Sequence, residues 1–187
     1  MDKIILLNRN FNIIPAVVKL KPEQAAAYFM LGETTGTSAG GASEAGIFLR
    51  VPGTNPFFCQ EDYLQGNRFF DLMKSATDVD VYLFNTGCVG GNEKNSQAKK
   101  VKIRDSSAIL ESVMQDAITW KEEEQFGYYI AEHVPGIDDE DLLQPQRLYR
   151  KQKREAEYVT MTNQIREDRI KYINQFDGLY PQIKDAI

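Results

Sequence analysis

Short apolar runs alternate with longer helical segments along this 187-residue chain, and this alternation constrains the fold more than any other feature. The runs at Lys3–Leu7 and Val79–Phe84 have the length of buried strands. Helical patterns cover about Pro22–Phe29 and Asp62–Ala76, the first with proline in the tolerated first turn. Strands alternating with helices predict an α/β fold, with a mixed sheet and flanking helices.

A second kind of strand pattern is predicted at Lys100–Arg104. There Val101 and Ile103 would face one side and the cations the other, and Asp105 or Ser106 would then cap a helix. Three cations on one strand face most simply indicate a solvent-exposed surface. Beside a nucleotide pocket, the same cations would meet phosphates or stack on an adenine ring.

The C-terminal third is predicted to be mainly helical. After a candidate strand at Phe126–Val134, a charged segment from Arg147 to Phe176 indicates one long or twice-broken helix. Its predicted core anchors are Tyr158, Ile165, Ile170 and Ile173. A chain of this length fits one domain, with an α/β part at about 1–135 and a helical extension at about 136–187.

The composition argues against several classes of protein. The chain is 42% hydrophobic and 26% charged, which is ordinary globular composition, and its net charge of −5 gives no electrostatic reason to expect nucleic acid. No stretch approaches the ~18–20 apolar residues of a membrane helix, and no signal peptide is evident. Cys59 and Cys88 lack CxxC spacing, which favours reduced thiols. The expected location is the cytoplasm.

The glycine-rich stretch from Gly36 to Gly41 is the first candidate for phosphate binding, because glycines let backbone amides approach a phosphate closely. A P-loop also needs G-K-[ST], which occurs nowhere in the chain. On the residues alone, a surface loop is favoured over a phosphate cradle. Arg50 could supply a fixed charge to a phosphate, although a lone arginine more often forms a surface ion pair.

No metal site is predicted. His133 is the only histidine, and a structural role suits it better than catalysis or metal binding. The acidic run Asp138–Asp141 resembles a metal-binding tract, but carboxylates that precede a helix also suit its dipole. The basic run Arg147–Arg154 is interpreted as a solvated helix face.

Read in order, five segments resemble the C-terminal portion of the ATP-type phosphoenolpyruvate carboxykinases. The third and fourth are similar to the family patterns YLVNTGW and KRISIKDTRAI. Each motif alone is weak, but five in the right order with near-family spacing are hard to obtain by chance. The segments are IILLNRNFNIIPAVVKLKPEQAAAYFMLG, GTSAGGASEAG, VYLFNTG, KKVKIRDSSAIL and FGYYIAEHVPGIDDEDLLQP.

This resemblance implies an enzyme that converts oxaloacetate and ATP to phosphoenolpyruvate, ADP and CO₂ with Mg²⁺ and Mn²⁺. Lys100 stands where the family has an arginine that stacks on the base, and Ser106 replaces a threonine. The residues that the resemblance assigns to adenine and ribose are Lys100, Val101, Lys102, Ile103 and Ser106.

The departures from the family pattern are equally informative. Ala39 replaces the arginine of the G-T-E-R-G turn, so that phosphate clamp is absent unless Arg50 substitutes for it, and Cys88 replaces a tryptophan. The P-loop, the metal ligands and the oxaloacetate-binding arginine lie upstream of this segment in the family. The expected fold is therefore an incomplete C-terminal lobe that is inactive alone, with at most a weak or partial ATP site.

The expected partners are nucleotide and the missing N-terminal, P-loop portion of the enzyme. Two alternatives remain open, namely a non-enzymatic nucleotide-binding or scaffold module and a subunit of a split enzyme. Self-association through an exposed strand edge at Lys3–Leu7 is a further expectation.

Overall fold

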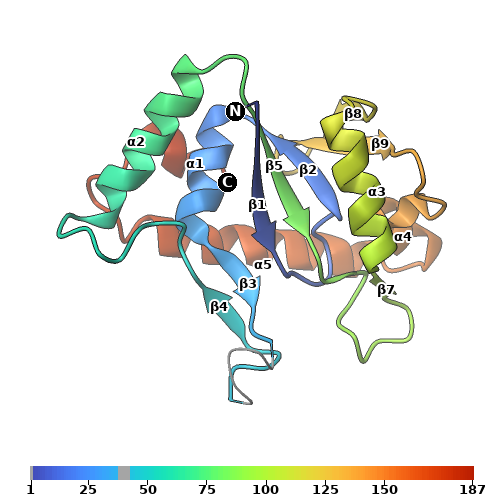
Figure 1. The fold of residues 1–187 in the computed structure, drawn as a ribbon. Helices are drawn as coiled ribbons and strands as arrows, with labels where there is room; N and C mark the ends of the chain where they lie inside the picture. Colours follow the sequence, from blue (N-terminus) through green and yellow to red (C-terminus); the bar gives the residue numbers. More distant parts are fainter. Residues whose placement is uncertain (1, 38–42) are drawn as a thin grey trace.

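A computed structural model describes residues 2–37 and 43–187, which form one mixed sheet flanked by helices (Figure 1). The main sheet has five strands in the order β1-β5-β2-β9-β8; β1 and β5 are parallel and the other neighbours antiparallel. This confirms the predicted α/β class. The strands are β1 (Lys3–Asn8), β2 (Val17–Leu20), β3 (Glu33–Thr35), β4 (Phe48–Arg50), β5 (Asp80–Asn85), β6 (Cys88–Val89), β7 (Lys99–Lys100), β8 (Thr119–Glu122) and β9 (Tyr129–His133).

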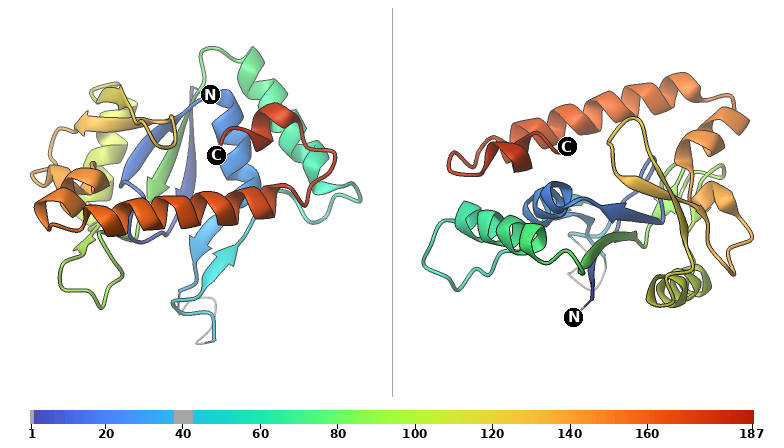
Figure 2. Two further views of the ribbon diagram at one scale, coloured as in Figure 1. Left: turned by 180° about the vertical axis from the view of Figure 1, so that it is seen from behind. Right: turned by 90° about the horizontal axis from the view of Figure 1, so that it is seen from above.

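Helices cover both faces of the sheet, as the two further views in Figure 2 show. The core between the sheet, α1 and α5 includes Met30, Leu83 and Ile173, whereas the core beneath α3 and α4 includes Phe84, Ile109 and Leu148. The helices are α1 (Pro22–Leu31), α2 (Asp62–Ser75), α3 (Ile103–Met114), the 3-10 helix η2 (Glu140–Leu142), α4 (Pro145–Lys151), α5 (Glu155–Ile173) and α6 (Pro181–Lys184).

The strand predicted at Lys100–Arg104 is wrong. Only Lys99 and Lys100 are in strand β7, and α3 begins at Ile103. Val101 is 5% exposed and Ile103 is 88% exposed, so they do not share a face. The carboxylate of Asp105 accepts a hydrogen bond from the backbone N–H of Lys102 at 2.9 Å, and Lys102, three residues before Asp105, is the N-cap of the helix.

The predicted strand at Phe126–Val134 is shorter in the structure. It forms β9, which pairs with β8 in a hairpin that the sequence reading missed. Phe126 lies in the connecting turn, where it is 7% exposed. Strand β8 has only four residues (TWKE), of which Trp120 alone is a large apolar residue, and an acidic run follows it, so the partner strand gave only a weak periodic signal.

The predicted C-terminal helix is interrupted around Lys153, whose φ of 57° cannot continue a right-handed helix. Tyr158 and Ile173 are buried as expected, whereas Ile170 is 41% exposed and is not a core anchor. The fully buried residue of that turn is Arg169. In the described part of the chain, the elements that follow Pro135 are all helical.

Strand β1 lies at the edge of the sheet and pairs with β5 on one side. It is therefore not the buried strand that its apolar run predicts, and Leu7 is 72% exposed. Side chains along β1 point alternately to the two faces of the sheet. Ile4 and Leu6 pack against the core that includes Met30, whereas Ile5, on the same face as Leu7, packs against the core beneath α3. None of the described helices has the length and hydrophobicity needed to span a membrane.

Candidate functional site

A cavity of about 690 Å³ opens where the carboxyl ends of β1 and β5 meet the first turn of α3. Ligand pockets typically span about 300–1,000 Å³, so this volume admits a nucleoside-sized molecule. β1 and β5 are parallel neighbours, and the crevice beyond the carboxyl ends of such strands is a common ligand site. All five residues assigned to adenine and ribose line this cavity: Lys100, Val101, Lys102, Ile103 and Ser106.

One wall of the cavity is apolar. Leu7 of β1 and Leu110 of α3 line it and are 72% and 44% exposed, and Ile103 beside them is 88% exposed. A flat aromatic ring could cover these side chains and remove apolar surface from water. Val101 has a different role, because its side chain is buried and its backbone N–H donates to the carbonyl of Gly87 at 3.0 Å.

Asn85 fixes the rim of this cavity, and the sequence reading gave it no role. Its buried side chain accepts hydrogen bonds from the backbone N–H groups of Asn10 and Gly87, each at 2.9 Å. It also donates to the carbonyl of Ile14 at 2.9 Å. One amide therefore joins the end of β5 to the loop after β1. The sequence signal that could have identified Asn85 is an asparagine at a strand end, two residues before a glycine.

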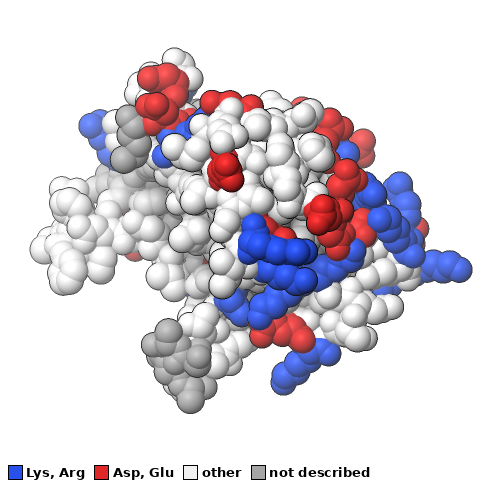
Figure 3. Space-filling model, turned by 45° about the vertical axis from the view of Figure 1, so that its right-hand side comes forward, with Lys and Arg blue, Asp and Glu red and all other residues white. Residues whose placement is uncertain are grey.

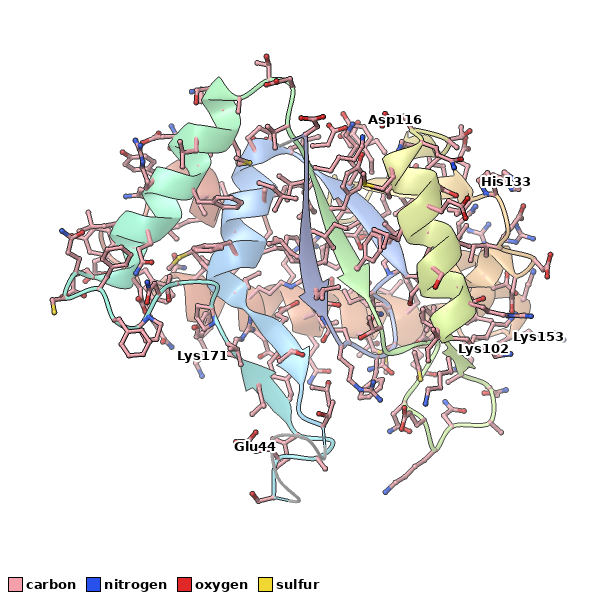
Figure 4. The ribbon with its side chains drawn as sticks, viewed as in Figure 1. Glu44, Lys102, Asp116, His133, Lys153 and Lys171 are labelled. Carbon is pink, nitrogen blue, oxygen red and sulfur yellow. The ribbon has the colours of Figure 1, made fainter. Side chains whose placement is uncertain are left out.

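Basic side chains surround the mouth of the cavity, and lysines and arginines gather on this face of the molecule (Figure 3). Figure 4 places Lys102 at the end of α3 where the helix begins. Arg9, directly after β1, also lines the cavity and was not identified from the sequence. Glu93 forms ion pairs with Arg9 at 2.7 Å and Lys100 at 3.0 Å, and the hydrogen bond from Lys100 holds the pKa of Glu93 below its ordinary value.

The acidic run holds β7 in place. Lys99 donates to both oxygens of Asp139 at 2.7 Å and to Asp141 at 2.9 Å, and Lys151 of α4 donates to Asp141 at 2.6 Å. Burial alone would raise the pKa of Asp141, but the hydrogen bonds from Lys151 and Lys99 outweigh it and lower that pKa. At the start of η2 the carboxylate of Asp139 also accepts a hydrogen bond from the backbone N–H of Asp141 at 3.2 Å, as the helix-start interpretation predicts. In addition, the run forms a clamp between β7, η2 and α4.

The basic run is only partly the solvated face that the sequence predicts. Lys151 binds Asp141, and Arg154 donates to the carbonyl of Gly90 at 2.9 Å and to both carboxylate oxygens of Glu157. The guanidinium of Arg154 also lies 4.6 Å from the ring centre of Tyr149. These contacts attach the start of α5 to the loop that carries Glu93.

The resemblance implies Mg²⁺ and Mn²⁺ for the whole enzyme. The described part of the chain offers no set of side chains that fits either ion. No three His, Cys, Asp or Glu side chains of residues 2–37 and 43–187 group where they could hold a metal ion. Asp139 and Asp141 are already bound by lysines. His133 is exposed at the end of β9 (Figure 4), and Cys59 and Cys88 are free thiols.

Arg50 lies away from this cavity. It donates to Glu33 at 3.1 Å and to the carbonyl of Leu31 at 3.3 Å, and its guanidinium lies 4.5 Å from the ring centre of Tyr172. It lines a separate cavity of about 250 Å³ beside Phe48. The structure therefore does not bring Arg50 together with the five cavity residues. Ala39, the other position discussed for a phosphate clamp, lies outside the described residues.

Comparison with known proteins agrees with the resemblance. A family model described as phosphoenolpyruvate carboxykinase, of the ATP type, matches residues 1–140. The phosphoenolpyruvate carboxykinase (ATP) of Aeropyrum pernix is 29% identical over 94% of this chain and 33% of its own length. Those of Shouchella clausii and Bacillus subtilis are each 30% identical, over 98% and 87% of this chain and 34% and 31% of their own lengths.

The chain thus spans about a third of the length of the curated relatives that it matches. The matched region includes the loop after β1, the end of β5 and the whole of the cavity lining, because residues 1–140 contain all of them. This chain therefore belongs to the ATP-type phosphoenolpyruvate carboxykinase family.

Proposed function

We propose that this chain supplies the adenine and ribose side of the nucleotide site of an ATP-dependent phosphoenolpyruvate carboxykinase. The observation that carries the proposal is that Lys100, Val101, Lys102, Ile103 and Ser106 line one cavity of suitable volume. The apolar wall suits the face of a base, and the hydroxyl of Ser106 suits hydrogen bonding to a sugar or base edge.

Under this proposal, the chain alone does not catalyse the carboxykinase reaction. Phosphoryl transfer from ATP depends on metal ions and cations that neutralise the transferring group. The described residues hold no fitting metal ligands, and the sequence has no G-K-[ST] motif. The cavity would therefore position the nucleoside part of ATP, and the groups that act on its γ-phosphate would come from the rest of the enzyme.

Ile103 offers a clean test of this site, because its side chain is 88% exposed and its loss leaves the core intact. The variant Ile103→Asp places a carboxylate in the first helical turn, where it suits the helix dipole. We expect calorimetry to show adenosine and ATP binding to the wild-type chain. We expect at least about fivefold weaker binding by the variant, since partial burial of an isoleucine is worth about 1 kcal/mol.

The matched control is Val159→Asp, which removes a 57% exposed apolar side chain from α5. This variant should bind both ligands as the wild-type chain does. Equal affinities for wild type and Ile103→Asp, or no binding of either ligand by the wild-type chain, would refute the proposed site. Micromolar affinity for ATP without other proteins would instead favour the stand-alone nucleotide-binding module, since the cavity lining lies within this chain.

A further inference from the structure

The carboxylate of Glu93 already pairs with two cations, Arg9 and Lys100, that line the proposed nucleotide cavity. Oε1 of Glu93 accepts from Nη2 of Arg9 at 2.7 Å, and the same oxygen lies 3.0 Å from Nζ of Lys100. Arg9 and Lys100 both line the cavity, the first directly after β1 and the second in β7. An anionic group that binds both cations must therefore compete with this carboxylate.

Contacts elsewhere hold the loop that carries Glu93. At its start, the backbone N–H of Gly90 donates to the carbonyl of Asn12 at 2.6 Å, and Arg154 donates to the carbonyl of Gly90 at 2.9 Å. At its end, the side chain of Gln152 donates to the carbonyl of Gln97 at 2.8 Å. The position of this loop therefore does not depend on Arg9 and Lys100 alone, and its contacts keep Glu93 beside two residues that line the cavity.

The three charges have opposite consequences for the two parts of a nucleotide. Arg9 and Lys100 together carry two positive charges, and Glu93 neutralises one of them. Base and ribose are uncharged, so they can enter against the apolar wall without disturbing these ion pairs. A phosphate must compete with the carboxylate for the same donors, and it also meets repulsion from a like charge.

We propose that Glu93 determines the specificity of this cavity by favouring the nucleoside part of a ligand over its phosphates. The inference rests on the proposed function, because it concerns the same cavity. It goes further by naming a residue that lowers the affinity of the isolated chain for phosphorylated nucleotides. In this arrangement, full phosphate binding requires Glu93 to leave Arg9 and Lys100.

Glu93→Gln tests this, because glutamine keeps the shape of the side chain and removes the charge. Calorimetry with adenosine and with ATP, at low and at physiological salt, gives the two affinities for each variant. We expect Glu93→Gln to bind ATP about three- to tenfold more tightly at low salt and to bind adenosine within about twofold of wild type. The gain for ATP should shrink at higher salt, since these charges are partly exposed.

Two further variants separate the charge from other effects. Glu93→Asp keeps the carboxylate and should keep the wild-type ratio of the two affinities. Glu132→Gln removes one negative charge from β9, where its carboxylate lies 4.0 Å from Lys121 at the far side of the sheet, and should leave both affinities unchanged. Circular dichroism of each variant checks that the fold is retained.

The outcomes distinguish this inference from the proposed function. Unchanged or weaker ATP binding by Glu93→Gln, while adenosine binds normally, would refute the role of Glu93 and leave the nucleotide site standing. Equal increases in ATP affinity in Glu93→Gln and Glu132→Gln would show that only the net charge of the protein matters, and would also refute the role of Glu93. If neither adenosine nor ATP binds to wild type or to Glu93→Gln, both proposals fail together.

Discussion

Arg169 and Glu33 form a buried ion pair that ties α5 to the β3–β4 hairpin. Arg169 is fully buried and donates to both carboxylate oxygens of Glu33 at 2.9 and 2.8 Å, and to the hydroxyl of Tyr28 at 2.9 Å. Removal of one partner would leave an uncompensated charge in the interior. We expect Glu33→Gln to lower the free energy of unfolding by about 3–5 kcal/mol, measured by urea denaturation. The double variant Glu33→Gln with Arg169→Met should recover part of this loss.

The same pair makes stability depend on pH with a definite sign. Burial alone would raise the pKa of Glu33, but Arg169 outweighs it and holds this pKa below its ordinary value. A carboxylate with a depressed folded pKa stabilises the fold above its unfolded pKa, about 4.3, and that contribution is lost as the pH falls through the folded pKa. Stability should therefore fall below about pH 4, less steeply in the double variant. If the free energy of unfolding fell equally steeply with pH in the wild type and in the double variant, the assignment to Glu33 would be contradicted.

Among the elements, β7 depends on its clamp to η2 and α4, because it is only two residues long. Asp141, 4% exposed, joins Lys99 to Lys151. We expect Asp141→Asn to lower the free energy of unfolding by about 1–2 kcal/mol and to speed amide exchange at Lys100. The exposed neighbour Asp138 gives the control, because Asp138→Asn makes the same change of charge. A similar effect of both substitutions would show that the clamp has no special role.

The same elements show what the sequence could and could not predict. Pro22 at the start of α1, the apolar positions of α2 and the apolar run of β5 identified these elements to within one or two residues of their bounds. A five-residue alternation at Lys100–Arg104 was too short to separate a strand from the cap and first turn of a helix. The stretch Lys100–Ser106 is contiguous, so a resemblance could find that part of the site. Arg9 and Glu93 are 84 residues apart, and only the fold brings them together.

At the scale of the whole molecule, the edge of the sheet next to the cavity exposes large apolar side chains. Within the described chain, β1 pairs with β5 alone, and Leu7 and Ile103 are 72% and 88% exposed. An open strand edge beside apolar side chains is a template for pairing with another chain. In the full-length relatives, which are about three times longer, other segments are available to cover such a surface. In the isolated chain, a second copy is the available partner.

We therefore predict that the isolated chain self-associates through β1. Light scattering should show an average mass that rises with concentration, and Leu7→Lys should keep the protein monomeric, since lysine on an edge strand opposes pairing. Leu72→Lys, which changes a 42% exposed leucine on α2, should leave the association unchanged. Because Leu7 also lines the cavity, excess adenosine should shift the equilibrium toward monomer by binding the form in which that wall is open. A monomer at every concentration would refute this use of the edge, and dimers that persist equally in Leu7→Lys would place the contact elsewhere.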